Sequence, residues 1–126
     1  MGSGATNRRK GHQMERDIAK EFRELGYTHC KTSREASKLL DNCKVDLWGI
    51  PYNIQSKNGY TKGLNYQEIL DQIKELLTKE YPQRLEYPTV IFHKRKTSQL
   101  AIMDKKDLLT LLSKIAKYEG TETKYF

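Results

Sequence analysis

Residues 45–57 read VDLWGIPYNIQSK and place an acid, an amide and a lysine, Asp46, Gln55 and Lys57, inside two strand-like segments. Val45–Ile50 is apolar, β-branched or aromatic apart from Asp46 and one glycine, which predicts a strand. Turn-forming residues follow, and the alternating run after them predicts a second strand with Gln55 and Lys57 on one face. The stretch therefore predicts a hairpin. Charges among core residues are costly unless they meet a partner, a metal or water, so this hairpin is the first candidate for chemistry.

The composition fits one basic domain. The chain has 126 residues, with 23 basic and 16 acidic side chains and a net charge of +7. A single domain is expected at this length. The charge favours a polyanionic partner, either nucleic acid or an anionic membrane surface, and the alternative is that it serves solubility alone.

Two cysteines, Cys30 and Cys43, are too few to hold a secreted fold together and have no metal-ligand pattern around them. We expect buried free thiols in a reducing compartment. No apolar run has transmembrane length, and no signal-peptide pattern is present. The sequence therefore predicts a soluble, cytoplasmic protein.

A helix is predicted over His12–Leu25, with Gly26 as its stop. One arc of the helical wheel holds its apolar residues, which are Met14, Ile18, Ala19, Phe22 and Leu25. Glu15 falls inside this arc, where a carboxylate needs a cation, a metal or a hydrogen-bond network. The alternative is a carboxylate at the helix start that pairs locally with Arg16 or Lys10.

Residues 1–10 are expected to form a flexible basic arm, and 11–126 a single domain. Arg8, Arg9 and Lys10 are candidates for phosphate contacts, or simply a solvated run of charge. The later basic turn, Lys94–Lys96, has the same functional interpretation. The alternative is that these charges prevent the edge of the sheet from pairing with another chain.

The remaining elements follow from periodicity and turn residues. We expect strands over 27–32, 45–50 and 53–57, a polar loop over 33–44 with one helical turn near 36–40, a helix over 66–81, strands over 87–96 and 100–103, and a helix after Asp104. This α-β-β-β-α-β-β-α order predicts an α/β (α+β) sandwich with a central mixed β-sheet flanked by helices. The strands on either side of the 66–81 helix are expected to be parallel, with a right-handed crossover.

The last predicted helix has a broad apolar arc, formed by Leu108, Leu109, Leu111, Leu112, Ile115 and Ala116. Such an arc either covers the sheet or forms a dimer interface.

Glu15, Asp46, Gln55 and Lys57 converge if the first helix packs beside the hairpin. Two carboxylates and an amide oxygen are hard ligands of the kind that bind Mg²⁺. A neighbouring lysine can orient water or stabilise charge that develops on a phosphate. With a basic surface, this set predicts metal-assisted phosphodiester hydrolysis.

The set also resembles the signature of PD-(D/E)xK nucleases, in which a helix acid precedes Asp and then (Glu/Gln)-x-Lys on adjacent strands. The stretches RKGHQMER, residues 9–16, and FRELGY, residues 22–27, resemble the opening of archaeal and phage Holliday junction resolvases. The resemblance covers roughly residues 9–81. It implies a restriction-endonuclease-like fold, and a phage gene expressed in a bacterial host is one source it suggests.

Two positions depart from the family pattern. Val45 stands where proline is common, and Gln55 stands where glutamate is common. Glutamine keeps an oxygen ligand but loses a charge, so metal affinity is expected to fall. Glu35 or Asp41 are candidates to restore that charge. Resolvases of this type use a serine from the loop, for which Ser33 and Ser37 are candidates and Ser37 is preferred.

The resemblance implies a Mg²⁺-dependent, structure-selective endodeoxyribonuclease that cuts four-way DNA junctions as a homodimer, with Mn²⁺ able to substitute. Glu15, Asp46, Gln55 and the Ser56 carbonyl would bind the metal, and Lys57 would polarise water or phosphate. The expected DNA-backbone contacts are Arg8, Arg9, Lys10, Arg34, Lys94, Arg95 and Lys96. The alternatives are a general or nicking nuclease of the same fold and a non-catalytic DNA-binding module.

Overall fold

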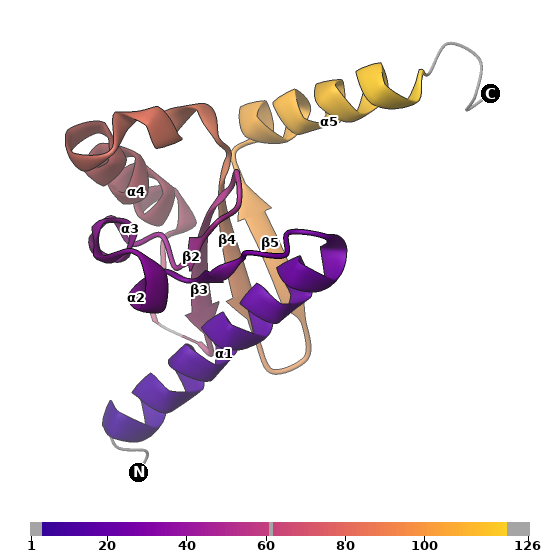
Figure 1. Cartoon of the computed structure of the whole chain (residues 1–126). Coiled ribbons are helices and arrows are strands. Elements are labelled where there is room, and N and C mark those ends of the chain that lie inside the picture. Colours follow the sequence, from indigo (N-terminus) through magenta and orange to yellow (C-terminus); the bar gives the residue numbers. More distant parts are fainter. Residues whose placement is uncertain (1–3, 61, 121–126) are drawn as a thin grey trace.

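The computed structural model describes residues 4–60 and 62–120 and has the mixed α and β composition expected from the sequence (Figure 1). Its elements are α1 (Gly4–Leu25), β1 (Lys31–Thr32), α2 (Ser33–Ala36), α3 (Lys38–Asn42), β2 (Leu47–Trp48), β3 (Asn53–Asn58), α4 (Tyr66–Glu80), the 3₁₀ helix η1 (Pro82–Glu86), β4 (Thr89–Lys94), β5 (Gln99–Met103) and α5 (Lys105–Glu119). Residues 1–3 of the predicted arm lie outside the described residues.

The described strands form two sheets, whereas the sequence predicted one central sheet. β1 and β2 pair antiparallel, and β3, β4 and β5 form the second sheet in that order. β3 and β4 are parallel, which confirms the prediction made from the helix between them. β4 and β5 are antiparallel. β4 is therefore the central strand, and β3 is an edge strand with Asp46 beside it.

The predicted hairpin over 45–57 is wrong, because β2 pairs with β1 and not with β3. One backbone hydrogen bond joins the two segments, donated by Asp46 N to Ile54 O at 2.7 Å. Gly49 contributes to the divergence: its φ is +86°, and a Cβ there would lie 2.9 Å from the His29 carbonyl oxygen. The chain turns away at this point, and the Asp46 side chain meets the edge of β3.

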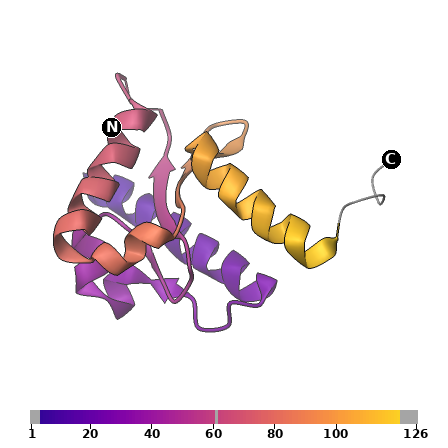
Figure 2. The same cartoon turned by 90° about the horizontal axis from the view of Figure 1, so that it is seen from above.

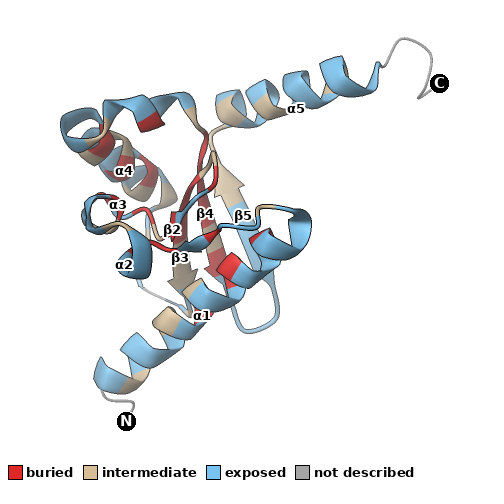
Figure 3. Ribbon diagram, viewed as in Figure 1, coloured by how far each residue is buried: buried red, intermediate tan, exposed pale blue. Residues whose placement is uncertain are grey.

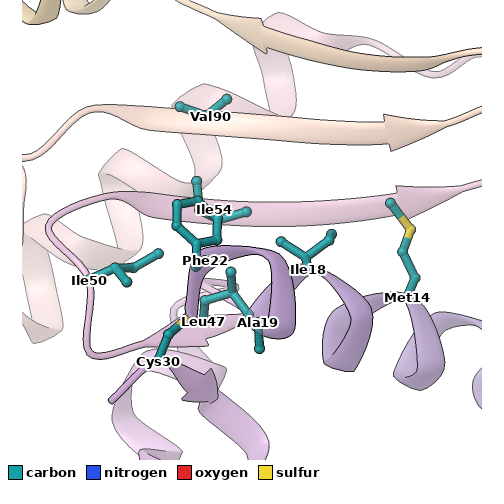
Figure 4. Close-up of a cluster of buried hydrophobic side chains, with 9 residues drawn as sticks. All are labelled: Met14, Ile18, Ala19, Phe22, Cys30, Leu47, Ile50, Ile54 and Val90. Carbon is teal, nitrogen blue, oxygen red and sulfur yellow. The ribbon is translucent and has the colours of Figure 1, made fainter. Parts of the chain in front are cut away.

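α1 packs across one face of the second sheet (Figure 4). Met14, Ile18, Ala19 and Phe22 are buried against β3 and β4 residues, which confirms most of the predicted arc. Burial of each large side chain contributes roughly 1.5–3 kcal/mol. Leu25 belongs to the same arc but is 74% exposed, because the helix ends there. The orientation of α1 is therefore set by its middle turns.

α1 begins at Gly4, so the predicted arm over 1–10 is helical from residue 4 onward. Arginine and lysine favour helices, and a single Gly11 costs only about 1 kcal/mol. The first turns extend beyond the sheet (Figure 1). Arg8, Arg9 and Lys10 are all exposed on this helical extension.

α4 packs in a second hydrophobic core, where its Ile73 and Leu77 are buried against Leu40, Cys43 and Val45. The helix was predicted over 66–81 and is confirmed. The side chain of Asn65 caps its start by accepting from Glu68 N at 3.2 Å, and Pro82 follows its end. The expected burial of Cys30 and Cys43 is also confirmed, and burial raises the pKa of both thiols.

The segment from 27 to 44 differs from its prediction. Only Lys31 and Thr32 of the predicted strand pair with β2, and the polar loop contains two short helices, α2 and α3. Ser37 separates these helices in an extended conformation and accepts a hydrogen bond from Leu40 N at 3.3 Å. The Ser37 cap accounts for the start of α3, whereas the side chain of Thr32, which precedes α2, makes no capping hydrogen bond.

α5 projects away from both sheets (Figures 1 and 2). Its predicted start is confirmed, since the Asp104 side chain accepts from Lys106 N at 2.9 Å. None of its residues is buried, and Figure 3 shows a largely exposed helix. The prediction that it covers the sheet is therefore wrong, while the dimer interface stays a prediction. Within the described residues, no helix has the length and apolar character needed to cross a membrane.

Candidate functional site

The Asp46 carboxylate lies against the edge of β3 and is held by Ser56. Ser56 N donates to Oδ2 at 2.7 Å, and Ser56 Oγ lies 3.1 Å from the same oxygen. Ser33 N donates to the Asp46 carbonyl at 2.8 Å and fixes the backbone from the other side. Among the described residues, none donates a hydrogen bond to Oδ1. One carboxylate oxygen is thus fixed, and the other is left for a ligand.

The electrostatic environment of Asp46 opposes its ionisation. Burial raises the pKa of its carboxyl from 3.8 to about 7, and the negative charges of Glu15 and Asp41 add to this effect. The hydrogen bonds from Ser56 lower the pKa but do not outweigh the burial. A cation placed beside Asp46 would therefore relieve an unfavourable charge, which is the electrostatic condition for a metal site.

Glu15 approaches Asp46 from α1, close enough for their charges to interact. Its side chain is 15% exposed, and its Oε2 accepts from Arg34 Nε at 3.1 Å and Arg34 Nη2 at 3.0 Å. The local partner suggested by the sequence is wrong, because Arg16 donates to Gln13 instead. Arg34, predicted to contact DNA, is thus the cation that neutralises Glu15.

Two buried side-chain oxygens near the segments that contact Asp46 in the sequence have no hydrogen-bond partner in the described part of the chain. They are Gln55 Oε1, on a residue 8% exposed, and Ser33 Oγ, on a residue 0% exposed. A buried polar atom without a partner costs about 1–3 kcal/mol, so a ligand or water is expected at each. Gln55 precedes Ser56 in β3, and Ser33 bonds the Asp46 backbone.

Ser56 and Lys57 are the remaining candidate site residues on β3. Since the N–H and C=O of a strand residue point to the same side, the Ser56 carbonyl faces the Asp46 side together with its N–H. Lys57 is half-buried and makes no ion pair with any described residue. Its side chain shares a face with that of Gln55, as predicted. The ammonium group of Lys57 is therefore available to an anion.

The candidate site residues predicted in the 33–44 loop lie at different distances from Asp46. Ser37, the preferred serine, caps α3 and lines a hollow with Trp48 and Arg84, and no described contact joins it to Asp46. Ser33 does contact Asp46 through its backbone. Asp41 is half-buried and raises the Asp46 pKa, whereas Glu35 is exposed. The geometry favours Ser33 and Asp41 as neighbours of the site.

Most of the predicted DNA contacts form a surface beyond the end of β3. Lys94, Arg95 and Lys96 are exposed at the β4–β5 turn and line a hollow with Asn58–Tyr60. Lys10 lines a second hollow with the same three residues. Arg8 and Arg9 are exposed farther along α1, and Arg34 stands apart because it binds Glu15.

The donor set fits a divalent cation that prefers oxygen ligands. Asp46 Oδ1 and the Ser56 carbonyl are candidates at the edge of β3, with Glu15 adjacent, and Gln55 Oε1 belongs to the next residue of the strand, with no hydrogen bond to Asp46. No group of three or more His, Cys, Asp or Glu suited to a metal occurs among residues 4–60 and 62–120. The candidate set has two carboxylates only, so its remaining ligands would be an amide oxygen, a backbone oxygen and water.

Arg84 stabilises the turn that precedes β3, and nothing in the sequence around it predicts this role. It is 9% exposed, and its guanidinium donates to Asn53 Oδ1, the Ile50 carbonyl and the Tyr52 carbonyl at 2.9–3.1 Å. Asn53 Nδ2 in turn donates to the Arg84 carbonyl at 2.9 Å. Burial lowers the pKa of Arg84. These bonds fix the turn that leads into β3.

Comparisons with protein-family models, curated proteins and solved structures found no match to this chain.

Proposed function

We propose that this protein is a Mg²⁺-dependent endodeoxyribonuclease of the PD-(D/E)xK type, with a restriction-endonuclease-like core. The observation that carries the proposal is the half-buried Asp46 carboxylate, whose ionisation is opposed by desolvation and by the neighbouring charge of Glu15. Such a site holds an unfavourable charge that a bound divalent cation would relieve. The proposed substrate is a four-way DNA junction.

Each residue has a defined role in this proposal. Asp46, Gln55 and the Ser56 carbonyl hold the cation, and Glu15 adds negative charge beside them. The bound Mg²⁺ (or Mn²⁺) supplies positive charge that polarises the scissile phosphate and the attacking water. Water forms a bond to phosphorus while the bond to the leaving oxygen breaks. Lys57 donates a hydrogen bond to the phosphate and stabilises its developing charge.

The proposed active unit is a homodimer, because two nicks in a junction need two sites. α5 offers the apolar surface for it: Leu108, Leu109, Leu112 and Ile115 are each 41–53% exposed. Leu112→Glu is expected to leave a monomer in light scattering, while Lys114→Glu on the same helix leaves the dimer intact. A wild-type monomer at all concentrations would contradict this part of the proposal.

We also propose a cytoplasmic location, since unpaired Cys30 and Cys43 suit a reducing compartment.

The decisive assay incubates a labelled four-way junction and a matched linear duplex with Mg²⁺ or with EDTA. Symmetric nicks in the junction that vanish in EDTA and in Asp46→Asn support the proposal. Asp17→Asn is the matched control, because Asp17 is an exposed acid on α1. Binding of the junction without any cleavage would instead identify a non-catalytic DNA-binding module.

A second candidate function is a general or nicking nuclease of the same fold. It is favoured by the basic surface at the β4–β5 turn, whose lysine and arginine side chains contact phosphates without regard to sequence. Equal cleavage of the junction and the duplex in the same assay would select this candidate.

A further inference from the structure

Tyr60 stands at the meeting point of three surface hollows, none of which is lined by Asp46, Glu15 or Gln55. One hollow is lined by the β4–β5 turn, one by the first turns of α1, and one by the start of α4. Tyr60 lines all three and is 82% exposed. The ring of Tyr60 is therefore accessible to a ligand.

The backbone that presents Tyr60 is anchored. Gly59 N donates to the Lys94 carbonyl at 2.8 Å, and the Gly59 carbonyl lies 2.6 Å from His93 Nε2. His93 is 3% exposed, and its Nδ1 lies 2.7 Å from the Tyr66 hydroxyl. These contacts connect the loop to β4 and α4. The backbone next to Tyr60 is therefore fixed by buried structure, which lowers the entropic cost of binding at this loop.

Cations flank the ring on two sides. Lys10 comes from α1, and Lys94, Arg95 and Lys96 come from the β4–β5 turn. None of these four makes an ion pair with any residue that the structure describes. Amide and hydroxyl groups of Asn7, Asn58 and Ser98 line the same hollows. The surface thus combines an exposed ring with uncompensated positive charge.

This combination fits unpaired nucleotides. Exposed bases stack on aromatic side chains while lysine and arginine contact the phosphates, and this mode is tolerant of sequence. Bases inside a duplex already stack on one another and do not reach such a ring. We propose that the surface formed by Tyr60, Lys10 and Lys94–Lys96, called here the Tyr60 surface, binds single-stranded DNA.

The position of the Tyr60 surface relates it to the candidate site. Tyr60 follows Lys57 by three residues, so the two are at most about 10 Å apart along an extended chain. The inference rests on the proposed function only for its choice of DNA, and it names the substrate feature: an unpaired segment beside the duplex that is cut. Cleavage is not needed for the binding itself.

The test measures fluorescence anisotropy with a labelled 15-nucleotide oligothymidine and with a labelled duplex of equal length, both in EDTA. Tyr60→Ala is expected to weaken binding of the single strand by about tenfold and to leave duplex binding within about twofold. Tyr60→Phe keeps the ring and retains wild-type affinity. Tyr118→Ala is the matched control, since Tyr118 is 93% exposed on α5 and lines none of the three hollows.

Arg95→Ala combined with Lys96→Ala is expected to reduce the salt dependence of single-strand binding. Unchanged single-strand affinity in Tyr60→Ala, or equal losses for the single strand and the duplex, would overturn the proposal. Tighter binding of single-stranded RNA of matched length would overturn the choice of DNA. Because EDTA prevents metal-dependent cleavage, failure of the nuclease proposal does not affect these outcomes.

Discussion

Replacement of Asp46 by asparagine is expected to stabilise the metal-free protein at alkaline pH. The folded protein raises the pKa of this carboxyl from 3.8 to about 7, so folding favours its protonated form. The stability from that proton is present below about pH 4 and is lost as the pH rises through about 7. At 1.36 kcal/mol per pKa unit, the full loss is about 4 kcal/mol.

Asparagine keeps the shape of the side chain and removes the buried charge. Between pH 5 and pH 8, the wild-type protein is expected to lose about 2–3 kcal/mol of unfolding free energy through Asp46, and the variant none of it. At pH 8 the variant gains about 2–4 kcal/mol over the wild type, less whatever the Ser56 hydrogen bonds lose with an amide acceptor.

The assay is urea unfolding in EDTA at both pH values, followed by circular dichroism. Asp17→Asn serves as the control, because this acid is exposed and its replacement should change stability by less than about 0.5 kcal/mol. If Asp46→Asn is less stable than the wild type at pH 8, or keeps the wild-type pH dependence, the description of Asp46 as a destabilised buried acid is refuted.

Three further results are expected. Mg²⁺ should raise the melting temperature of the wild type at pH 8 and leave Asp46→Asn unchanged, because the cation offsets the buried charge; equal shifts in both proteins would place the cation elsewhere. Gln55→Glu should show equal or higher nuclease activity at low Mg²⁺ in the junction assay, since it adds a charged ligand, and a loss of activity would contradict the view of Gln55 as a weakened ligand. Arg84→Ala should cost about 2–5 kcal/mol in urea unfolding, because it leaves the Ile50 and Tyr52 carbonyls without donors, whereas Gln83→Ala beside it should change little.

Local periodicity was enough to predict the elements that pack through their own residues. The buried positions of α1 and the extent of α4 follow from apolar spacing, and the cap residue Asp104 marks the start of α5. The parallel pairing of β3 with β4 follows from the helix between them. In each case the information lies within one element or in the order of two.

The failures involve contacts between distant segments. β2 pairs with β1 because Gly49 packs under the His29 backbone, and the sequence around Gly49 does not reveal that partner. Arg84 lies in an ordinary polar run, and its acceptors are more than thirty residues away. The Glu15 wheel position did indicate an unusual carboxylate, but its partner Arg34 comes from a segment predicted as loop.

The projecting helix α5 also has a consequence for how the chain reaches its final structure. Isolated helices shorter than about 12–15 residues are marginal in water, and α5 has 15 residues with none buried. If a second copy supplies that burial, as proposed, helix formation in the last quarter of the chain becomes a concentration-dependent step. Dilution would then unwind this segment while the two cores remain folded, and far-ultraviolet circular dichroism would report the amount of partner present.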